Sequence, residues 1–322
     1  MAHVYSNGSG ALDAQDRALK ALLDQLRDAA YEFTTVTPLT QARVLRNRRG
    51  ALGKSLQDIF GWSMPFGIHA LRPSLMDTLL RADVLNREEG GLYRSRVRVS
   101  TLDTDLFLHS AFPTVEHDAV FFGPDTSRFF SLIRDHLPAA RPEAPLRIAD
   151  IGCGSGAGGI MAARLRVGAA VVLNDINPHA LRFARINAES AGLHVELAQG
   201  DSVAALSSNF DVVLSNPPYL VDDAARAYRH GGEDLGRALS VRIGAQALQR
   251  LSPGGRLILY TGVAIVEGVD HFIKDMEPFL GEAACTYTYC EIDPDVFGEE
   301  LERPAYEGAD RIAAVGLVAV KA

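Results

Sequence analysis

The second half of the chain alternates apolar strand-like segments with helical segments, and this alternation restricts the fold more than any other feature. Five apolar segments of strand length occur, at residues 147–151, 171–174, 195–198, 210–215 and 256–261. Helical patterns begin between them, at Gly156, at Pro178 and at residue 237. Strands that are apolar along their whole length and alternate with helices form a parallel sheet covered on both faces. The pattern therefore predicts an α/β fold with a mostly parallel sheet.

The first part of the chain has a different pattern. Four leucines at helical spacing predict an amphipathic helix over residues 13–31. Shorter helical patterns follow between residues 42 and 85, and three arginines then alternate with apolar residues over 93–99. This alternation predicts a half-buried strand that shows its arginines to solvent. Helices followed by such a strand favour a mixed α+β unit that is winged-helix-like.

A proline-rich stretch separates these two patterns. It covers residues 141–145, directly before the first strong strand. At 322 residues the chain has room for two compact units. We therefore divide it into a loose polar tail over residues 1–12, an N-terminal accessory domain over 13–115 and a catalytic domain over 116–322.

Composition restricts the cellular location and the kinds of binding partner that we expect for this chain. No apolar run approaches the length of a membrane span, and the first ten residues do not resemble a secretion signal. The three cysteines form no CxxC pair, which suits a reducing cytoplasm and gives no indication of a metal site. The formal net charge is −8, and its excess of acids lies entirely after residue 120. A long polyanion would be repelled there without a local basic strip.

A glycine-rich turn joins the first strand of the α/β part to its helix. Gly152, Gly154 and Gly156 let the backbone approach a ligand closely, and the helix that follows offers free N–H groups. The same spacing also fits a nicotinamide dinucleotide site, so this turn alone does not choose between cofactors.

Acidic residues at successive strand ends favour S-adenosylmethionine (SAM) over a dinucleotide. Asp150, two residues before the first glycine, would repel a pyrophosphate but accepts hydrogen bonds from a cationic amino-acid group. Asp175, followed by Ile176, can accept from ribose hydroxyls, although a nicotinamide site would place an acid similarly. Asp201 and Ser202 follow the third strand, at the height of an adenine amino group. Each acid alone could equally be a loop or helix cap.

The segment after the fourth strand reads Asn216-Pro217-Pro218-Tyr219. This motif resembles the NPPY class of SAM-dependent methyltransferases, and within it the HemK/PrmC-type enzymes that methylate a glutamine side-chain nitrogen. The resemblance covers residues 120–260 and implies a Rossmann-like class I methyltransferase with a seven-stranded sheet. It also implies SAM as cofactor and S-adenosylhomocysteine as product.

The chemistry of a planar nitrogen explains this motif. Such a nitrogen is a poor nucleophile because its lone pair is delocalised. The Asn216 side-chain oxygen and the Pro217 carbonyl can accept its two hydrogens and aim the lone pair at the methyl group. The two prolines hold the loop rigid, and Tyr219 offers a flat face for stacking. No strong base is required.

Two flanking segments extend the resemblance. Residues 117–126 resemble the segment that lies over the SAM site in these enzymes, which implies that Phe122 covers the cofactor and Thr126 bonds its amino-acid end. A simple helix cap before a helix over 127–137 explains this segment nearly as well. Residues 231–236 match the glycine-acid loop of the family.

Other parts of the chain leave the methyl acceptor open. The first 110 residues do not resemble the substrate domain of the release-factor enzymes, and an acidic segment over 289–302 could hold a cationic guanidino group. Eleven cations over residues 43–98 could follow a phosphate backbone, although solvated surfaces explain them equally well.

We therefore expect a SAM-dependent N-methyltransferase that acts on an amide or guanidino nitrogen of a protein or an amino-acid-like small molecule. An adenine-N6 methyltransferase acting on RNA or DNA is the second hypothesis, and a non-catalytic SAM-binding subunit is the third. We expect no membrane partner and no metal, and a homodimer stays open.

Overall fold

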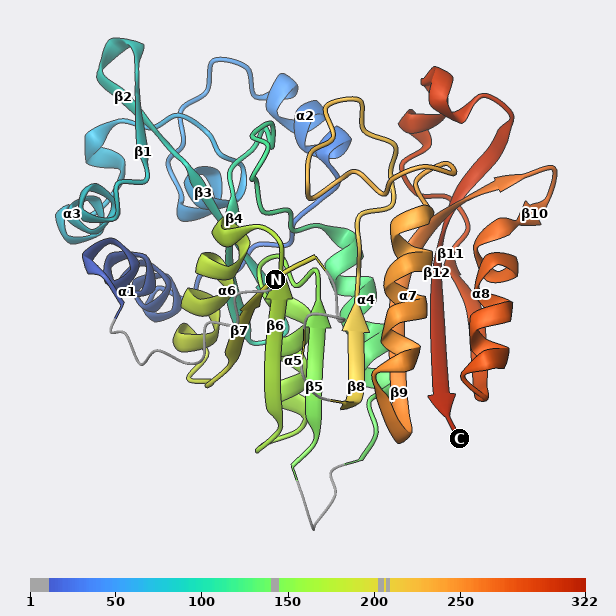
Figure 1. The fold of residues 1–322 in the computed structure, drawn as a ribbon. Helices are drawn as coiled ribbons and strands as arrows, with labels where there is room; N and C mark the ends of the chain where they lie inside the picture. The colour runs from blue at the N-terminus through green and yellow to red at the C-terminus, as the bar shows by residue number, and fades with distance from the viewer. Residues whose placement is uncertain (1–11, 140–144, 202–205, 207–208) are drawn as a thin grey trace.

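A computed structural model describes residues 12–139, 145–201, 206 and 209–322 of the chain. Its centre is an eight-stranded sheet in the order β11-β12-β9-β8-β5-β6-β7, with the short β10 paired to β9 (Figure 1). The strands are β5 (Arg147–Ile151), β6 (Ala170–Asp175), β7 (Glu196–Gln199), β8 (Phe210–Ser215), β9 (Leu251–Val266), β10 (Val269–Asp270), β11 (Cys285–Asp293) and β12 (Ala309–Lys321).

The sheet is mostly parallel. Strands β5 to β9 run in one direction, whereas β12 lies antiparallel to both β9 and β11. The strand order reverses beside β5, so the ends of β5 and β8 flank the point where open α/β sheets bind ligands. This confirms the predicted Rossmann-like α/β class, and the two-residue β10 is an addition to the seven expected strands.

Helices cover both faces of the sheet because its strands are apolar on both sides. On one face, Ile148 of β5 and Val212 of β8 pack with the helices α4, α5 and α6. On the other face, Ala149 and Val213 pack with α7 and α8. The helices are α4 (Pro124–His136), α5 (Ala157–Leu165), α6 (Pro178–Ser190), α7 (Ala238–Gln249) and α8 (His271–Glu282).

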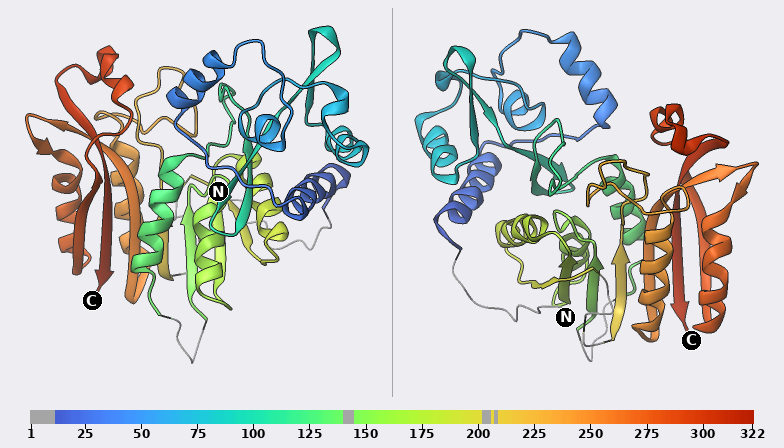
Figure 2. Two further views of the ribbon diagram at one scale, coloured as in Figure 1. Left: turned by 180° about the vertical axis from the view of Figure 1, so that it is seen from behind. Right: turned by 45° about the horizontal axis from the view of Figure 1, so that its top comes forward.

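The N-terminal region, residues 12–115, combines helices with two hairpins at one end of the sheet (Figure 2). Its helical elements are α1 (Ala14–Asp28), α2 (Pro38–Asn47), α3 (Pro73–Ala82) and the short turns η1 (Gln57–Gly61), η2 (Ile68–Ala70) and η3 (Glu89–Gly91). Its hairpins are β1 (Leu85–Glu88) with β2 (Leu92–Ser95), and β3 (Val97–Leu102) with β4 (Asp105–Ser110). The predicted α+β mixture is confirmed, and the winged-helix likeness stays a prediction.

Helix α6 joins the N-terminal region to the sheet. Phe183 and Ile186 of α6 are buried in the same apolar cluster as the leucines of α1. Arg182 pairs with Asp16 at 2.6 Å. The Asn187 side chain exchanges two hydrogen bonds with the backbone of Leu108 in β4, at 2.8 and 3.1 Å. These contacts fix the N-terminal region over the carboxyl ends of β5 and β6.

The prediction of a single half-buried strand over residues 93–99 is wrong in two respects. It is interrupted at Arg96, and β2 and β3 belong to different hairpins. Arg98 is only 4% exposed, whereas the sequence suggested an arginine facing solvent. Its guanidinium donates to the carbonyl of Gly61 and to the side-chain oxygen of Gln41. Burial lowers the Arg98 pKa to about 10.

Several helix and strand ends differ from the predicted ones by a few residues. The helix predicted over 127–137 begins earlier, at Pro124, because proline suits the first turn of a helix. Strand β9 is much longer than residues 256–261, since it pairs with β12 along nearly its whole length. No helix in the described ranges is both long and apolar enough to cross a membrane.

The remaining helical elements are two short turns after β11, which hold the acidic segment against the sheet. They are η5 (Gly298–Glu302) and η6 (Pro304–Tyr306). Tyr306 is fully buried beneath them and accepts a hydrogen bond from the backbone N–H of Val221, at 2.9 Å. The acidic segment therefore lies beside the loop that follows β8.

Candidate active site

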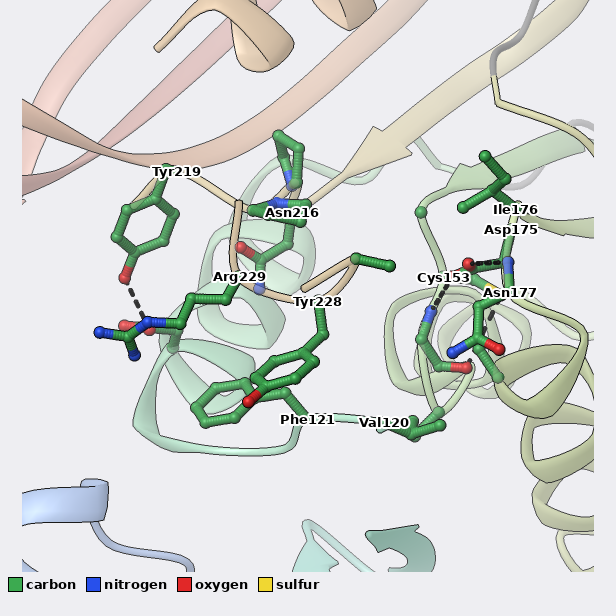
Figure 3. Close-up of a pocket in the computed structure, with 18 of the residues that line it drawn as sticks. Val120, Phe121, Cys153, Asp175, Ile176, Asn177, Asn216, Tyr219, Tyr228 and Arg229 are labelled. Atoms are coloured by element: carbon green, nitrogen blue, oxygen red, sulfur yellow. Dashed lines mark hydrogen bonds between the residues drawn. The ribbon is translucent and has the colours of Figure 1, made fainter. Parts of the chain in front are cut away.

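A cavity of about 500 Å³ lies at the carboxyl ends of β5, β6 and β8. Its walls come from the turns after β5 and β6, the loop after β8, the segment before α4, and the N-terminal region (Figure 3). Most of the residues assigned from the sequence line this cavity. They are Thr126, Asp150, Gly152, Gly154, Asp175, Ile176, Asp201, Asn216, Pro217 and Tyr219.

The glycine turn after β5 has the conformation that its sequence suggests. Gly152, Gly154 and Gly156 all have positive φ angles, of 67°, 54° and 79°. A Cβ atom added at Gly152 or Gly154 would meet no atom within 4 Å, so this side of the turn is open to the cavity. Gly156 caps the N-terminus of α5, where a ligand can approach free N–H groups.

Asp150 is buried at the base of this turn. One of its carboxylate oxygens accepts from the backbone N–H of Gly159 in α5, at 2.7 Å. A Cβ on Gly158 would lie 2.9 Å from that oxygen, so glycine permits the close packing of α5 on β5. Burial raises the pKa of Asp150 to about 7, and the nearby Asp175 adds to the increase. The site therefore favours a cation beside this carboxyl group.

Asp175 ends β6 and holds two loops together. Its carboxylate accepts from the backbone N–H of Gly154 at 2.8 Å and from that of Asn177 at 2.9 Å (Figure 3). Burial raises its pKa, opposed by the backbone N–H donors. In the carboxylate form its oxygens could also accept hydrogen bonds from hydroxyl donors in the cavity. The neighbouring Ile176 is 58% exposed at the cavity, which is unusual for a large apolar side chain. It offers an apolar surface for a flat ring.

The end of β7, the third strand of the α/β part, is less enclosed than the ends of β5 and β6. Asp201 is exposed, and its carboxylate lies 3.9 Å from the guanidinium of Arg242 in α7. Ser202, also assigned from the sequence, lies outside the described residues.

Asn216 follows the last residue of β8, and its side-chain amide points into the cavity on the side of Phe121 and Tyr228 (Figure 3). Within the described part of the chain this amide has no hydrogen-bond partner, although it is half-buried. An unoccupied amide in a half-buried position is suited to bind a ligand that presents a complementary polar group.

Glycines of the loop between β8 and α7 support the Asn-Pro-Pro-Tyr backbone. A Cβ on Gly236 would lie 2.2 Å from the carbonyl oxygen of Tyr219, and one on Gly231 would lie 2.6 Å from the Cα of Tyr219. Leu220 exchanges backbone hydrogen bonds with this loop, accepting from Gly231 and donating to Arg229. The glycine-acid segment therefore braces the motif at a separation that only glycine permits.

Tyr219 is anchored by Asp125, which the sequence suggested only as a helix cap. Both Tyr219 and Tyr260 donate their hydroxyls to the Asp125 carboxylate at 2.7 Å. Arg128 adds a bond to Asp125 at 3.2 Å and another to Asp293 at 2.6 Å. Burial raises the Asp125 pKa, opposed by these donors. The ring of Tyr219 is only 7% exposed, so one part of it faces the cavity.

The segment before α4 requires one correction. Phe122 is buried between β4 and α4, where it stacks on His109 with ring centroids 5.2 Å apart. Phe121 lines the cavity instead. Gly123 makes room for the Phe121 ring, because a Cβ atom there would lie 2.6 Å from the Cζ atom of Phe121. Thr126 both lines the cavity and closes a capping box with Gly123.

Tyr228, which has no local signature, connects the loop after β8 to the N-terminal region. Its hydroxyl donates to the carbonyl of Thr114 at 2.7 Å. Its ring stacks on Phe121 with centroids 6.3 Å apart and planes 11° from parallel. Phe112 and Pro113 line the same end of the cavity. Sequence patterns could not identify these residues because they meet only in the folded chain.

Several carboxylates of the acidic segment over residues 289–302 form ion pairs with arginines. Glu300 is buried and pairs with Arg229 and Arg303. Arg303 lies three residues further along the chain, whereas Arg229 comes from the loop between β8 and α7. Asp293 pairs with Arg128 and Glu291 with Arg311. These three carboxylates of the acidic segment are therefore neutralised within the protein.

Comparison with known proteins agrees with this geometry. Residues 127–265 match the family model described as "Methyltransferase small domain". A release factor glutamine methyltransferase of Lactococcus lactis is 29% identical over 55% of this chain and 65% of that protein. The one from Deinococcus radiodurans is 37% identical, over 42% of this chain and 51% of that protein. Ribosomal RNA large subunit methyltransferase G of Alcanivorax borkumensis is 35% identical over 41% of this chain and 30% of that protein.

The chain thus spans between about half and just under two thirds of these two glutamine methyltransferases. Its α/β part is similar to class I SAM-dependent methyltransferases of the HemK type.

Proposed function

We propose that this protein transfers a methyl group from SAM to a planar side-chain amide nitrogen, on a protein or on an amino-acid-like molecule. The observation that carries the proposal is the free amide of Asn216, which precedes two prolines and lies at the cavity beside the end of β5. An amide in that position can recognise an NH₂ group through its oxygen.

The cavity suits SAM in volume and in its polar groups. We assign Asp150 to the cationic amino-acid end, together with Thr126 and the glycine turn. Asp175 is assigned to the ribose hydroxyls, and the exposed face of Ile176 to the adenine ring. SAM, when bound, supplies an electrophilic methyl carbon on a sulfonium centre. Apart from Thr126 in α4, these groups lie at strand ends of the same sheet edge.

The protein's own residues orient the acceptor. The Asn216 side-chain oxygen and the Pro217 carbonyl accept the two hydrogens of the acceptor NH₂ group. These contacts draw the nitrogen away from planarity, and they stabilise the positive charge that develops as it is methylated. Since the nitrogen loses its surplus proton to water afterwards, no buried base is needed. The aromatic wall beside Asn216 excludes water from the acceptor.

The charges around the cavity favour an amide over a guanidino group. A guanidinium would require a free carboxylate nearby. Asp125 is occupied by two tyrosines and an arginine, and Glu300 is paired with Arg229 and Arg303. Arg226 and Arg229 line the cavity as well, and they already occupy Asp222 and Glu300. An uncharged amide needs no such counter-ion.

Asn216→Ala provides the test. SAM affinity, measured by calorimetry, should change less than about twofold, whereas turnover of an amide acceptor should fall about a hundredfold or more. Turnover is measured by transfer of a labelled methyl group to glutamine-containing peptides, followed by mass spectrometry. An equal loss of affinity and turnover would contradict the role assigned to Asn216.

A further inference from the structure

The structure separates the eleven cations of residues 43–98 into distinct groups. Arg98 is buried, and Arg48, Arg81 and Arg94 pair with acids. Within the described residues, seven others have no acidic partner. They are Arg43, Arg46, Arg49, Lys54, Arg72, Arg87 and Arg96.

Three of these seven form a strip along one helix. Arg43, Arg46 and Arg49 are spaced three residues apart and are all exposed. The turns continue past the end of α2, because Arg48 donates to the carbonyl of Val44 and Arg49 to that of Arg46. Residues at this spacing share one side of a helix. We name Arg43, Arg46 and Arg49 the arginine strip.

No acid interrupts this part of the chain. Residues 33–57 contain no Asp or Glu, although the whole protein carries a formal net charge of −8. Lys54 adds one more exposed cation just after the strip. A concentrated positive surface on an acidic protein restricts where a polyanion can bind.

Helix α2 is held in place by a polar contact, and four of its ten residues are exposed. Gln41 is its one buried residue, and it bonds to Arg98 and to the carbonyl of Gly61. The first residue of α2, Pro38, lines the active-site cavity. In all three views the helix lies beside the loop that joins β8 to α7 (Figures 1 and 2). The arginine strip therefore leads away from the mouth of the cavity.

We propose that the arginine strip binds the phosphate backbone of a nucleic acid and positions it beside the methyltransferase cavity. Guanidinium groups match phosphate oxygens in geometry and charge. A protein partner would need apolar or aromatic anchors. Among the described residues of 33–57, Leu52 is the exposed large apolar side chain, and the half-buried Trp62 is covered by Arg48. The proposal concerns binding alone and does not depend on the identity of the methylated group.

The experiment measures binding of the full chain to fluorescent single-stranded RNA and to DNA of the same sequence, by anisotropy, across about 50 to about 300 mM salt. The strip variant is R43Q/R46Q/R49Q. The matched control is R72Q/R87Q/R96Q, which removes three other exposed cations that have no acidic partner in the described residues and do not line the cavity. Circular dichroism verifies that both variants are folded.

We expect wild-type affinity to fall steeply with salt. The strip variant should bind at least about tenfold more weakly and lose about two to three units of the salt slope, roughly one for each phosphate contact. The control variant and R43K/R46K/R49K should bind within about threefold of wild type. A preference for RNA or for DNA identifies which backbone the strip accepts.

Three results would overturn the proposal. The first is equal weakening by the strip and control variants, and the second is an absence of salt-dependent binding. The third is binding of poly-glutamate as tightly as nucleic acid, which would show a general attraction to acids. Because no methylation is measured, the Asn216→Ala result stands separately from each of them.

Discussion

The cavity has two halves that are built in different ways. In the cofactor half, Asp150 and Asp175 lie at the ends of adjacent strands, and the turns that follow them supply the other groups. In the acceptor half, Phe121, Tyr228 and Phe297 converge from distant parts of the sequence. The Tyr228 hydroxyl, for example, bonds to a carbonyl 114 residues earlier.

This difference separates what the fold requires from what a particular substrate requires. Strand ends of a parallel sheet meet at one edge in every protein with this topology, so a cofactor site there follows from the fold. The acceptor half depends on loops and on the N-terminal region, which can change without altering the sheet. Asp125 lies at the junction, since α4 carries it beside the cofactor half while it holds Tyr219 in the acceptor half.

Asp125→Ala should have the largest effect of the changes that test this division. Removing the carboxylate leaves two tyrosine hydroxyls and Arg128 without their buried partner. We expect a loss of about 3 kcal/mol in the free energy of unfolding, measured by denaturant titration. Turnover should fall at least about tenfold because Tyr219 loses its anchor.

Asp77→Ala is the matched control for that change. It also removes a carboxylate from an arginine, but the pair with Arg81 is exposed and should contribute less than about 0.5 kcal/mol. SAM affinity of Asp125→Ala should fall less than turnover does. A loss of SAM affinity as large as the loss of turnover would mean that the two halves are one unit.

The cofactor half should be detectable through the pH dependence of SAM affinity. Asp150 has a pKa of about 7 in the folded protein, so it is about half protonated at neutral pH. A cationic ligand requires the carboxylate form, and SAM affinity should therefore rise about tenfold between about pH 6 and 8 and then level off. Calorimetry in buffers of different ionisation enthalpy would detect the proton released on binding. In Asp150→Asn the rise and the proton release should both disappear.

The same shift predicts an effect on stability without ligand. The pKa of Asp150 is raised above the usual 3.8, because burial disfavours its charged form. As pH rises from about 4 to 7, Asp150 ionises in the unfolded chain but stays largely protonated in the folded protein. This group therefore lowers the free energy of unfolding over that range. Asp150→Asn cannot ionise and should gain stability relative to wild type as pH rises to 7. A constant difference between the two proteins across this range would contradict the raised pKa.

Sequence reasoning recovered the fold and selected strand-end residues that line the cavity, because both depend on local patterns. Apolar strands, helix starts and the acids at strand ends repeat at short spacing, so each of them can be read within a few residues. Asn216 could be found for the same reason, since its motif is four consecutive residues after a strand. The structure then places Asp150, Asp175 and Asn216 around one cavity.

The errors occurred where distant contacts override local pattern. The alternation around Arg98 suggested an arginine facing solvent, but Gln41 and the Gly61 carbonyl provide buried partners that no local pattern reveals. Phe121 and Phe122 are chemically equal neighbours, and only the folded chain shows that Phe122 stacks on His109 while Phe121 fits beside Gly123 at the cavity. Asp125 looked like a helix cap until two tyrosines from other elements met it.

Tyr228→Phe tests the acceptor half alone and should have the smallest effect. It removes the hydroxyl bond to Thr114 but keeps the ring that stacks on Phe121. One hydrogen bond of this kind contributes about 1 kcal/mol, so we expect the KM for the acceptor to rise about threefold to fivefold. The kcat and the SAM affinity should change little, because Asn216 and the strand ends are untouched. Tyr287→Phe is the control, since its hydroxyl contacts Glu277 on an exposed surface at 3.4 Å. If Tyr228→Phe weakened SAM binding as much as acceptor binding, the loop after β8 would belong to the cofactor half, and the division between a fold-determined and a loop-determined half would fail.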